Sequence, residues 1–169
     1  MKKIFIVNGS GGVGKDTFAD FLKEKVPVYK YSSIDKVKSI AKECGWDGGK
    51  TERDRKFLSD LKLLTTEYSD MPFNDIAVAV QKFRTHKALG DVMLIDIREP
   101  EEIERAKKTF GAMTILIKRE SVPAITSNMA DTNVENYEYD FVVYNDGTLD
   151  EFRELVHRFA DFILEKEND

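Results

Sequence analysis

The chain has 169 residues, 41% of them hydrophobic, so its length and composition predict one folded domain and argue against a disordered protein. Its 31 acidic and 26 basic side chains leave a net charge of −5, which argues against a nucleic-acid-binding surface. A single cysteine, Cys44, rules out an intramolecular disulfide and suits a reducing compartment, so we expect a cytoplasmic protein. The apolar run near the N-terminus is too short for a signal peptide, and no stretch approaches the roughly twenty apolar residues that cross a membrane.

Strand and helix patterns alternate along the chain. We predict strands near 3–8, 28–32, 91–96, 113–118 and 140–144, and helices near 15–25, 34–44, 51–67, 74–89, from 100 onward and over 149–164. Such alternation is typical of an α/β protein in which a doubly wound, parallel five-stranded sheet carries helices on both faces. The chain contains no repeat and no linker, so we expect one domain over residues 1–169.

Three details of the helices are predicted more closely. Ser32 or Ser33 is expected to cap the second helix, and Met71-Pro72 to interrupt the helical pattern. The third helix is expected to present one apolar face, formed by Phe57, Leu58, Leu61 and Leu64.

Residues 9–17 read GSGGVGKDT and stand between a predicted strand and a predicted helix. This spacing matches the phosphate-binding loop G-x-x-x-x-G-K, and the flanking strand and helix are the context that such a loop requires. Glycines allow backbone N–H groups to converge on phosphate oxygens, the helix N-terminus adds positive potential, and Lys15 adds a full charge. The alternative is a glycine-rich turn without a ligand. Asp16 departs from the usual pattern, because it occupies the place of a Ser or Thr and the hydroxyl follows at Thr17. The predicted nucleotide-binding residues of this loop are Gly9, Ser10, Gly11, Gly12, Val13, Gly14, Lys15, Asp16 and Thr17.

A carboxylate ends the apolar strand Met93-Leu94-Ile95-Asp96. If that strand lies beside the strand of the phosphate loop, Asp96 faces the metal and the phosphates; otherwise Asp96 is a helix cap or turn residue. Arg98 follows at the edge where strand ends collect ligands in doubly wound sheets. It can hold a phosphate with two parallel hydrogen bonds, or it can be a surface arginine paired with Glu101 or Glu102.

Asn145-Asp146-Gly147 follows the last predicted strand. Backbone geometry alone explains Asn and Gly in such a turn. Together with a phosphate loop, the same turn is a place where an adenine ring can rest against the backbone, so Asn145 and Gly147 are candidate nucleotide contacts.

With these motifs in order, nearly the whole chain resembles the nucleoside and nucleotide kinase branch of P-loop proteins. It is most similar to the subgroup with phage deoxynucleoside monophosphate kinases and animal phosphomevalonate kinase, which shares G-K-D in the loop, D-x-R after the third strand and N-x-G after the last. The resemblance implies a three-layer P-loop fold that uses ATP and Mg²⁺. It also implies that Lys15 bridges the β- and γ-phosphates, that Thr17 touches phosphate, and that Asp16, Thr17 and Asp96 are candidate metal ligands, in part through water.

In such kinases the segment at about 33–70 holds the phosphoryl acceptor. Ser33, Lys36, Arg53 and Arg98 are the candidate acceptor-binding residues, because the charge of a phosphorylated acceptor must be neutralised before a second phosphate approaches. For any one of these charged residues the alternative is a solvated helix face with i,i+4 pairs.

Residues 119–138 correspond to the short lid of these kinases. Lys15, Arg98 and Arg119 are therefore the predicted catalytic residues, with Arg119 stabilising charge on the transferred group as the lid closes. Residues 120–138 contain no Lys or Arg. Either Arg98 and Arg119 do that work alone, or the lid binds something other than a polyphosphate.

The predicted function is ATP-dependent phosphoryl transfer to a small phosphorylated acceptor, first of all a (deoxy)nucleoside monophosphate. Alternatives are a kinase of phosphomevalonate or another phosphorylated metabolite, as in dephospho-CoA kinase, and a non-catalytic ATP-binding regulator. A switch GTPase is disfavoured because the chain lacks N-K-x-D and a D-x-x-G after the third strand. We expect a small-molecule substrate, neither nucleic acid nor membrane as a partner, and a monomer or homodimer.

Overall fold

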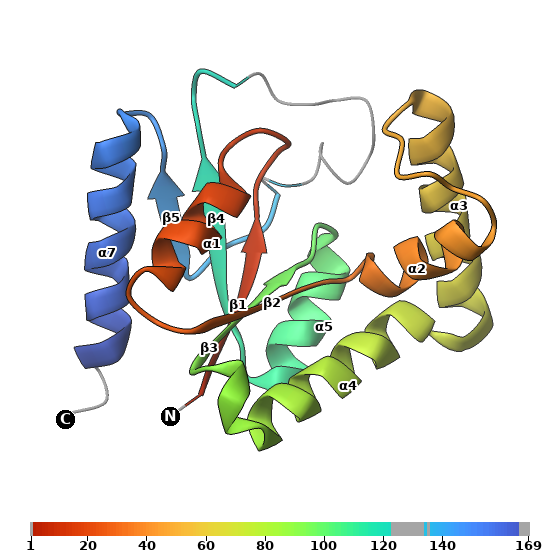
Figure 1. Cartoon of the computed structure of the whole chain (residues 1–169), viewed down its shortest axis with the longest axis horizontal. Coiled ribbons are helices and arrows are strands. Elements are labelled where there is room, and N and C mark those ends of the chain that lie inside the picture. Colours follow the sequence, from red (N-terminus) through yellow and green to blue (C-terminus); the bar gives the residue numbers. More distant parts are fainter. Residues whose placement is uncertain (1, 123–133, 135, 166–169) are drawn as a thin grey trace.

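A five-stranded parallel sheet forms the centre of the protein (Figure 1). The computed structural model describes residues 2–122, 134 and 136–165. The strands are β1 (Lys3–Asn8), β2 (Val28–Ser32), β3 (Val92–Asp96), β4 (Met113–Lys118) and β5 (Phe141–Tyr144), in the order β2-β3-β1-β4-β5. Strand β1 therefore lies between β3 and β4, with Val7 opposite both Asp96 and Ile115. This parallel α/β sheet confirms the predicted fold class, and each strand begins and ends within one residue of its prediction.

Helices cover both faces of the sheet (Figure 1). They are α1 (Lys15–Lys23), α2 (Asp35–Glu43), α3 (Glu52–Ser69), α4 (Met71–Thr85), the 3₁₀ turn η1 (Lys87–Leu89), α5 (Pro100–Phe110) and α7 (Leu149–Glu165). Successive side chains of a strand point to opposite faces. On β1, Phe5 and Val7 pack into the core under α1 and α7, whereas Ile4 and Ile6 pack into the core under α4 and α5.

The helices that cover the sheet pack by one apolar stripe each. On α7, Phe152, Val156, Ala160 and Ile163 are buried at spacings of three or four residues, which is the period that brings side chains to one face of a helix. Within residues 2–122 and 136–165, no helix combines the length and apolar character needed to cross a lipid bilayer.

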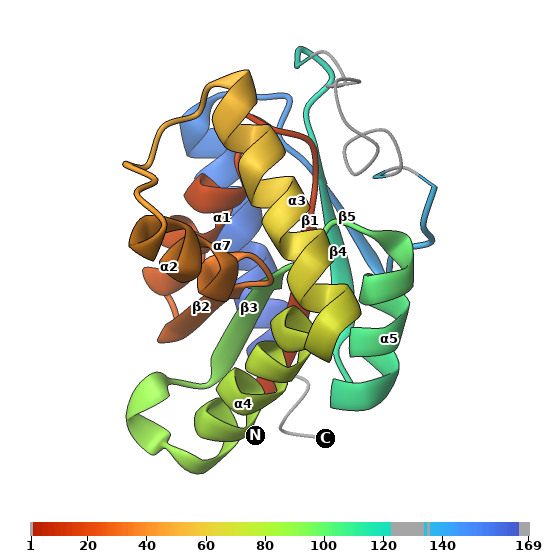
Figure 2. The same ribbon diagram turned by 90° about the vertical axis from the view of Figure 1, so that its right-hand side faces the viewer.

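Helix α3 departs from its prediction. None of its residues is buried, and Leu64, expected on an apolar face, has 63% of its surface exposed. The helix runs beside α2 and α4 (Figure 2); it lies at one end of the molecule and stands apart from the sheet (Figure 1). Toward the start of α5 its contact is polar: the Lys62 ammonium binds Glu99 at 3.0 Å and Glu102 at 2.9 Å. Phe57, Leu58 and Leu61 are half-buried where α3 packs beside α2 and α4, so the predicted apolar face is present in part, whereas Leu64 lies outside it.

Two helix boundaries also differ from the prediction. The break between α3 and α4 falls at Asp70, which adopts a left-handed conformation with φ of 53°, and Pro72 lies in the first turn of α4. Proline is tolerated there because the first helical N–H groups have no partner within the helix. The residue before α2 is Ile34, without a side-chain cap; the Ser32 hydroxyl only accepts a long hydrogen bond of 3.5 Å from the Ile34 N–H.

Candidate nucleotide-binding site

The phosphate loop joins β1 to α1. Gly9, Gly12 and Gly14 have φ values of 144°, 84° and 104°, which side chains rarely adopt. A Cβ atom on Gly9 would lie 2.5 Å from the backbone oxygen of Ile117, so strand β4 leaves no room for a larger residue there. The loop thus has the glycine conformations at the N-terminus of α1 that a phosphate-binding loop requires.

Lys15 begins α1 and folds back over the loop. Its ammonium donates hydrogen bonds to the carbonyl oxygens of Gly9 and, at 3.0 Å, Ser10. The Lys15 ammonium thus lies over the backbone of the loop, where a bound phosphate would also lie.

Asn8, which the sequence analysis did not single out, holds the start of the loop. It is fully buried; its side-chain oxygen accepts from the Gly9 N–H at 2.8 Å, and its side-chain nitrogen donates to the Arg98 carbonyl at 3.1 Å and the Tyr139 hydroxyl at 2.8 Å. Tyr139 in turn donates to the Val134 carbonyl at 2.8 Å. Burial raises the pKa of Tyr139 to about 12, so this hydroxyl keeps its proton. One amide side chain therefore connects the phosphate loop with the turn that carries Arg98.

Asn145 connects the loop with the turn after β5. Its buried amide donates to the Val13 carbonyl at 2.9 Å, and its backbone N–H donates to the Lys118 carbonyl at 2.8 Å. Gly147 lies just before the capping box of α7, in which the Glu151 carboxylate accepts from the Thr148 N–H at 2.7 Å. Asn145 is thus brought to the phosphate loop, whereas Gly147 lies in the turn before α7.

Asp16 and Asp96 lie on either side of a lysine. Lys30 on β2 donates a hydrogen bond to the Asp16 carboxylate, and its ammonium lies 3.5 Å from the Asp96 carboxylate. Two of the three predicted metal ligands are therefore close together, but no cluster of three or more His, Cys, Asp or Glu side chains suited to a metal occurs in the described parts of the chain. Thr17, the third predicted ligand, is half-buried on α1. Carboxylate and hydroxyl oxygens are donors that suit Mg²⁺, an ion that usually keeps several waters and binds substrate phosphates.

The pKa values of the two carboxyl groups are shifted in opposite directions because the exposure of the two side chains differs. The Asp16 side chain is 90% exposed, and its hydrogen bond from Lys30 lowers its pKa. The Asp96 side chain is only 25% exposed; burial raises its pKa, and the charges of Lys30 and Lys15 offset this only in part. Burial would lower the pKa of Lys30, but the two carboxylates outweigh it and raise that pKa.

The predicted acceptor residues lie around this centre in different ways. The Ser33 N–H donates to the Asp96 carbonyl at 3.1 Å, so the acceptor segment begins beside the aspartate. Lys36, Arg53 and Arg98 have exposed side chains. The first turn of α3, with Arg53, lies on the side of the molecule to which the strands point (Figures 1 and 2). Arg119 is exposed at the end of β4, and most of the predicted lid, residues 123–133 and 135, lies outside the described residues.

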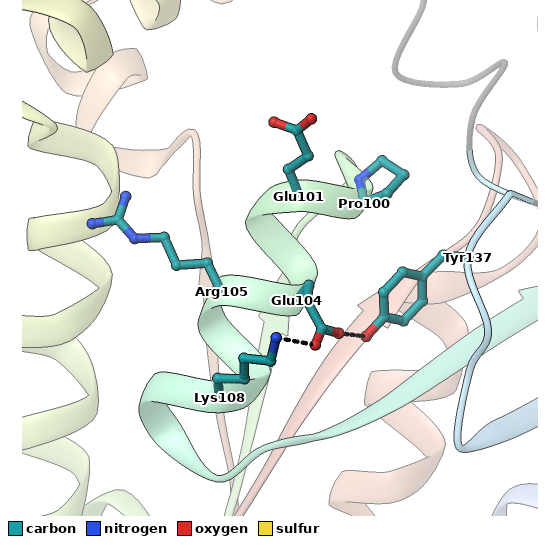
Figure 3. A pocket seen from close by; sticks show the side chains of 6 residues that line it. All are labelled: Pro100, Glu101, Glu104, Arg105, Lys108 and Tyr137. Atoms are coloured by element: carbon teal, nitrogen blue, oxygen red, sulfur yellow. Dashed lines mark hydrogen bonds and ion pairs between the residues drawn. The ribbon is translucent and has the colours of Figure 1, made fainter.

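Two hollows lie near these elements. A small cavity of about 60 Å³ is enclosed by α3, α4, the start of α5 and the residues after β2 and β3; its lining includes Ser33, Phe73, Ile97, Glu102 and Arg105. A wide, open hollow of about 610 Å³ lies along α5, where Glu104 binds both Lys108 and Tyr137 (Figure 3). No residue of the phosphate loop lines the second hollow; Glu104, Lys108 and Tyr137 pair with one another there, and Arg105 binds Asp70 outside it.

Comparison with solved structures gives the same architecture. A tunicamycin resistance protein from Deinococcus radiodurans matches with a TM-score of 0.55 and 13% identity over 94% of this chain and 96% of its own. A Thermus thermophilus protein matches with a TM-score of 0.54 and 17% identity over 98% and 97%. A sugar kinase from Janibacter matches with a TM-score of 0.51 and 11% identity over 95% of each chain. The chain has the fold of P-loop kinases. No protein-family model and no curated protein matches the sequence.

Lys30 and Asn8 are the site residues that motif analysis missed. The signal for Lys30 was the alternation in Val28-Tyr29-Lys30-Tyr31, which places the lysine on the face opposite the two tyrosines. Asn8 gave no comparable signal, because one polar residue at the end of an apolar strand occurs in many turns.

Proposed function

We propose that the protein transfers the γ-phosphoryl group of ATP to a small phosphorylated acceptor, and that this acceptor is a (deoxy)nucleoside monophosphate. The observation that carries the proposal is the place of Asp96 beside the phosphate loop: Val7 of β1 pairs with Asp96 of β3, and Lys15 follows at the start of α1. The loop proposed to bind the phosphates of ATP and the carboxylate proposed to bind their metal ion thus lie at the ends of adjacent strands.

The chain's own residues would divide the work as follows. The Gly9 N–H already donates to the Asn8 side chain, so the backbone N–H groups of residues 10–14 bind phosphate oxygens, and Lys15 turns from the loop carbonyls to the β- and γ-phosphates. Asp16, Thr17 and Asp96 would hold Mg²⁺, which when bound neutralises charge on these phosphates. Arg98 would orient the acceptor phosphate, and Arg119 would stabilise the charge on the transferred group.

The α2–α3–α4 segment supports an acceptor site next to that centre. The cavity there has both apolar walls, such as Phe73 and Ile97, and polar groups, such as Glu102 and Arg105, as a heterocyclic base would need. Its 60 Å³ is far below the roughly 300 Å³ of common ligand pockets. Acceptor binding in this cavity therefore requires α3 to move; no residue of α3 is buried, but the movement must break the contacts of Lys62 with Glu99 and Glu102.

Two other functions stay in competition. A kinase of phosphomevalonate or another phosphorylated metabolite would use the same phosphate loop with a different acceptor. A non-catalytic ATP-binding regulator is favoured by one observation, the absence of Lys and Arg from residues 120–138.

The test is a panel of nucleoside monophosphates and phosphorylated metabolites, first in thermal-shift assays with Mg²⁺ and a non-hydrolysable ATP analogue, then with ATP and detection of ADP. We expect a nucleoside monophosphate to raise the melting temperature further and to be phosphorylated, since a ligand stabilises the state that binds it. Lys15→Ala should lower turnover about a hundredfold or more in a folded protein. The matched control is Lys23→Ala, which removes the exposed lysine that pairs with Asp20 on the same helix.

The results separate the candidates. Phosphorylation of a different metabolite would replace the acceptor but keep the kinase. Tight binding of ATP with Mg²⁺ and no transfer to any member of the panel would favour the regulator. Near-wild-type turnover of Lys15→Ala would contradict the assignment of the phosphate loop.

A further inference from the structure

Asp16, Lys30 and Asp96 form a cluster in which the Asp16 side chain is 90% exposed and the other two side chains are largely buried. The three side chains come from α1, β2 and β3, and the Lys30 and Asp96 side chains are only 28% and 25% exposed. The Lys30 ammonium binds the Asp16 carboxylate directly and lies 3.5 Å from the Asp96 carboxylate. One cation therefore stands between two carboxylates from separate elements.

The sheet determines the position of Lys30. In the register of β2 with β3, Lys30 lies opposite Leu94, and Ser32 lies opposite Asp96. Tyr29 and Tyr31 pack on the α4 side of the sheet, so the intervening lysine faces α1 and the phosphate loop. A slip by one residue would bury the charge under α4, and the strand therefore holds the ammonium at the carboxylates.

We infer that Lys30 is a positioning residue that keeps Asp16 and Asp96 together as a preformed pair, and that a divalent cation must displace its ammonium to bind them. The inference rests on the proposed function, because these carboxylates are the proposed Mg²⁺ ligands. Two carboxylates that contact the same ammonium repel each other unless a positive charge lies between them. Lysine and metal ion need the same oxygens and repel one another, so they compete for the pair.

This competition has a consequence for the order of binding. The protein without nucleotide should bind a divalent cation weakly, since Lys30 already neutralises the carboxylates. Nucleotide phosphates bring further negative charge, which favours the metal ion and gives the released ammonium a new partner. The flexible four-carbon stem of lysine suits such a change of partner.

The test is Mn²⁺ binding to the full chain without nucleotide, measured from the electron paramagnetic resonance signal of free Mn²⁺. Lys30→Met and Lys30→Gln should each bind Mn²⁺ about tenfold or more tightly than the wild type, because a like charge within about 4 Å of the metal is removed. Lys30→Arg keeps the charge and should stay within about threefold of the wild type. Lys108→Met is the matched control, since it removes a lysine from an exposed pair with Glu104, and it should change nothing. Melting temperatures establish that each variant is folded.

Two outcomes overturn the inference: unchanged or weaker Mn²⁺ binding by folded Lys30→Met and Lys30→Gln, or an equal gain in Lys108→Met. The double variant Lys30→Met with Asp96→Asn should lose the gain, and its persistence would show that the metal binds elsewhere, which also refutes the competition. Nucleotide takes no part in this measurement. A protein that shows the Mn²⁺ gain but transfers no phosphoryl group would therefore refute the proposed function and leave the role of Lys30 intact.

Discussion

Replacing Asn8 by alanine should destabilise the protein more than its single amide suggests. The change removes three hydrogen bonds at a fully buried position, those with the Gly9 N–H, the Arg98 carbonyl and the Tyr139 hydroxyl. At a net value of about 1 kcal/mol for each hydrogen bond, the free energy of unfolding should fall by about 3 kcal/mol. For a chain of this length that corresponds to a melting temperature about 6–12 °C lower.

Urea denaturation followed by circular dichroism measures this loss. Asn74→Ala is the matched control, because Asn74 is exposed and makes one side-chain hydrogen bond, to the Ser69 carbonyl at 3.0 Å; its effect should stay within about 0.5 kcal/mol. Asn8→Ala should also weaken the binding of a non-hydrolysable ATP analogue, since Asn8 holds the first glycine of the loop. A loss of stability below 1 kcal/mol would refute the view that Asn8 connects the phosphate loop with the Arg98 turn.

Three further predictions concern the metal, the arginines and pH. Asp96→Asn should raise the Mg²⁺ concentration for half-maximal rate, since it removes a charge from the proposed metal site; an unchanged metal titration would exclude Asp96 as a ligand. Arg119→Ala should lower kcat more than it weakens ATP binding, whereas Arg98→Ala should also raise KM for the acceptor; a change in nucleotide affinity alone for Arg119→Ala would contradict its catalytic role. Burial would raise the pKa of the Asp140 carboxyl, but hydrogen bonds from Lys107 and from Thr114 of β4 outweigh it and lower that pKa. Asp140 therefore stabilises the fold at pH values above its ordinary pKa. This contribution is lost as the pH falls through the lowered pKa of the folded state. Asp140→Asn should therefore flatten the fall of unfolding free energy below about pH 4, and an unchanged slope in acid denaturation would count against this linkage.

Much of the architecture could be predicted because local signals and the fold agree. Buried strands of a parallel sheet are continuous apolar runs, so β1, β3 and β4 stand out in the sequence, and each is followed by a glycine, a carboxylate or a cation at the edge where ligands collect. The pairing of β1 with β3 confirms the expectation that Asp96 lies beside the phosphate loop. The roles of Arg53, Lys36 and Arg119 stay predictions, because packing does not determine where an exposed cationic side chain at the end of a helix or strand lies.

The sequence by itself determined the parallel α/β class and the phosphate loop, because alternation of apolar runs and a glycine-rich string before a lysine are read over a few neighbouring residues. Only the tertiary structure decided which distant groups meet: Asn8 with Tyr139, Asn145 with Val13, and Lys30 between two aspartates. These contacts depend on the order and register of the strands. They join residues up to 132 positions apart, a separation over which no local pattern in the chain carries information.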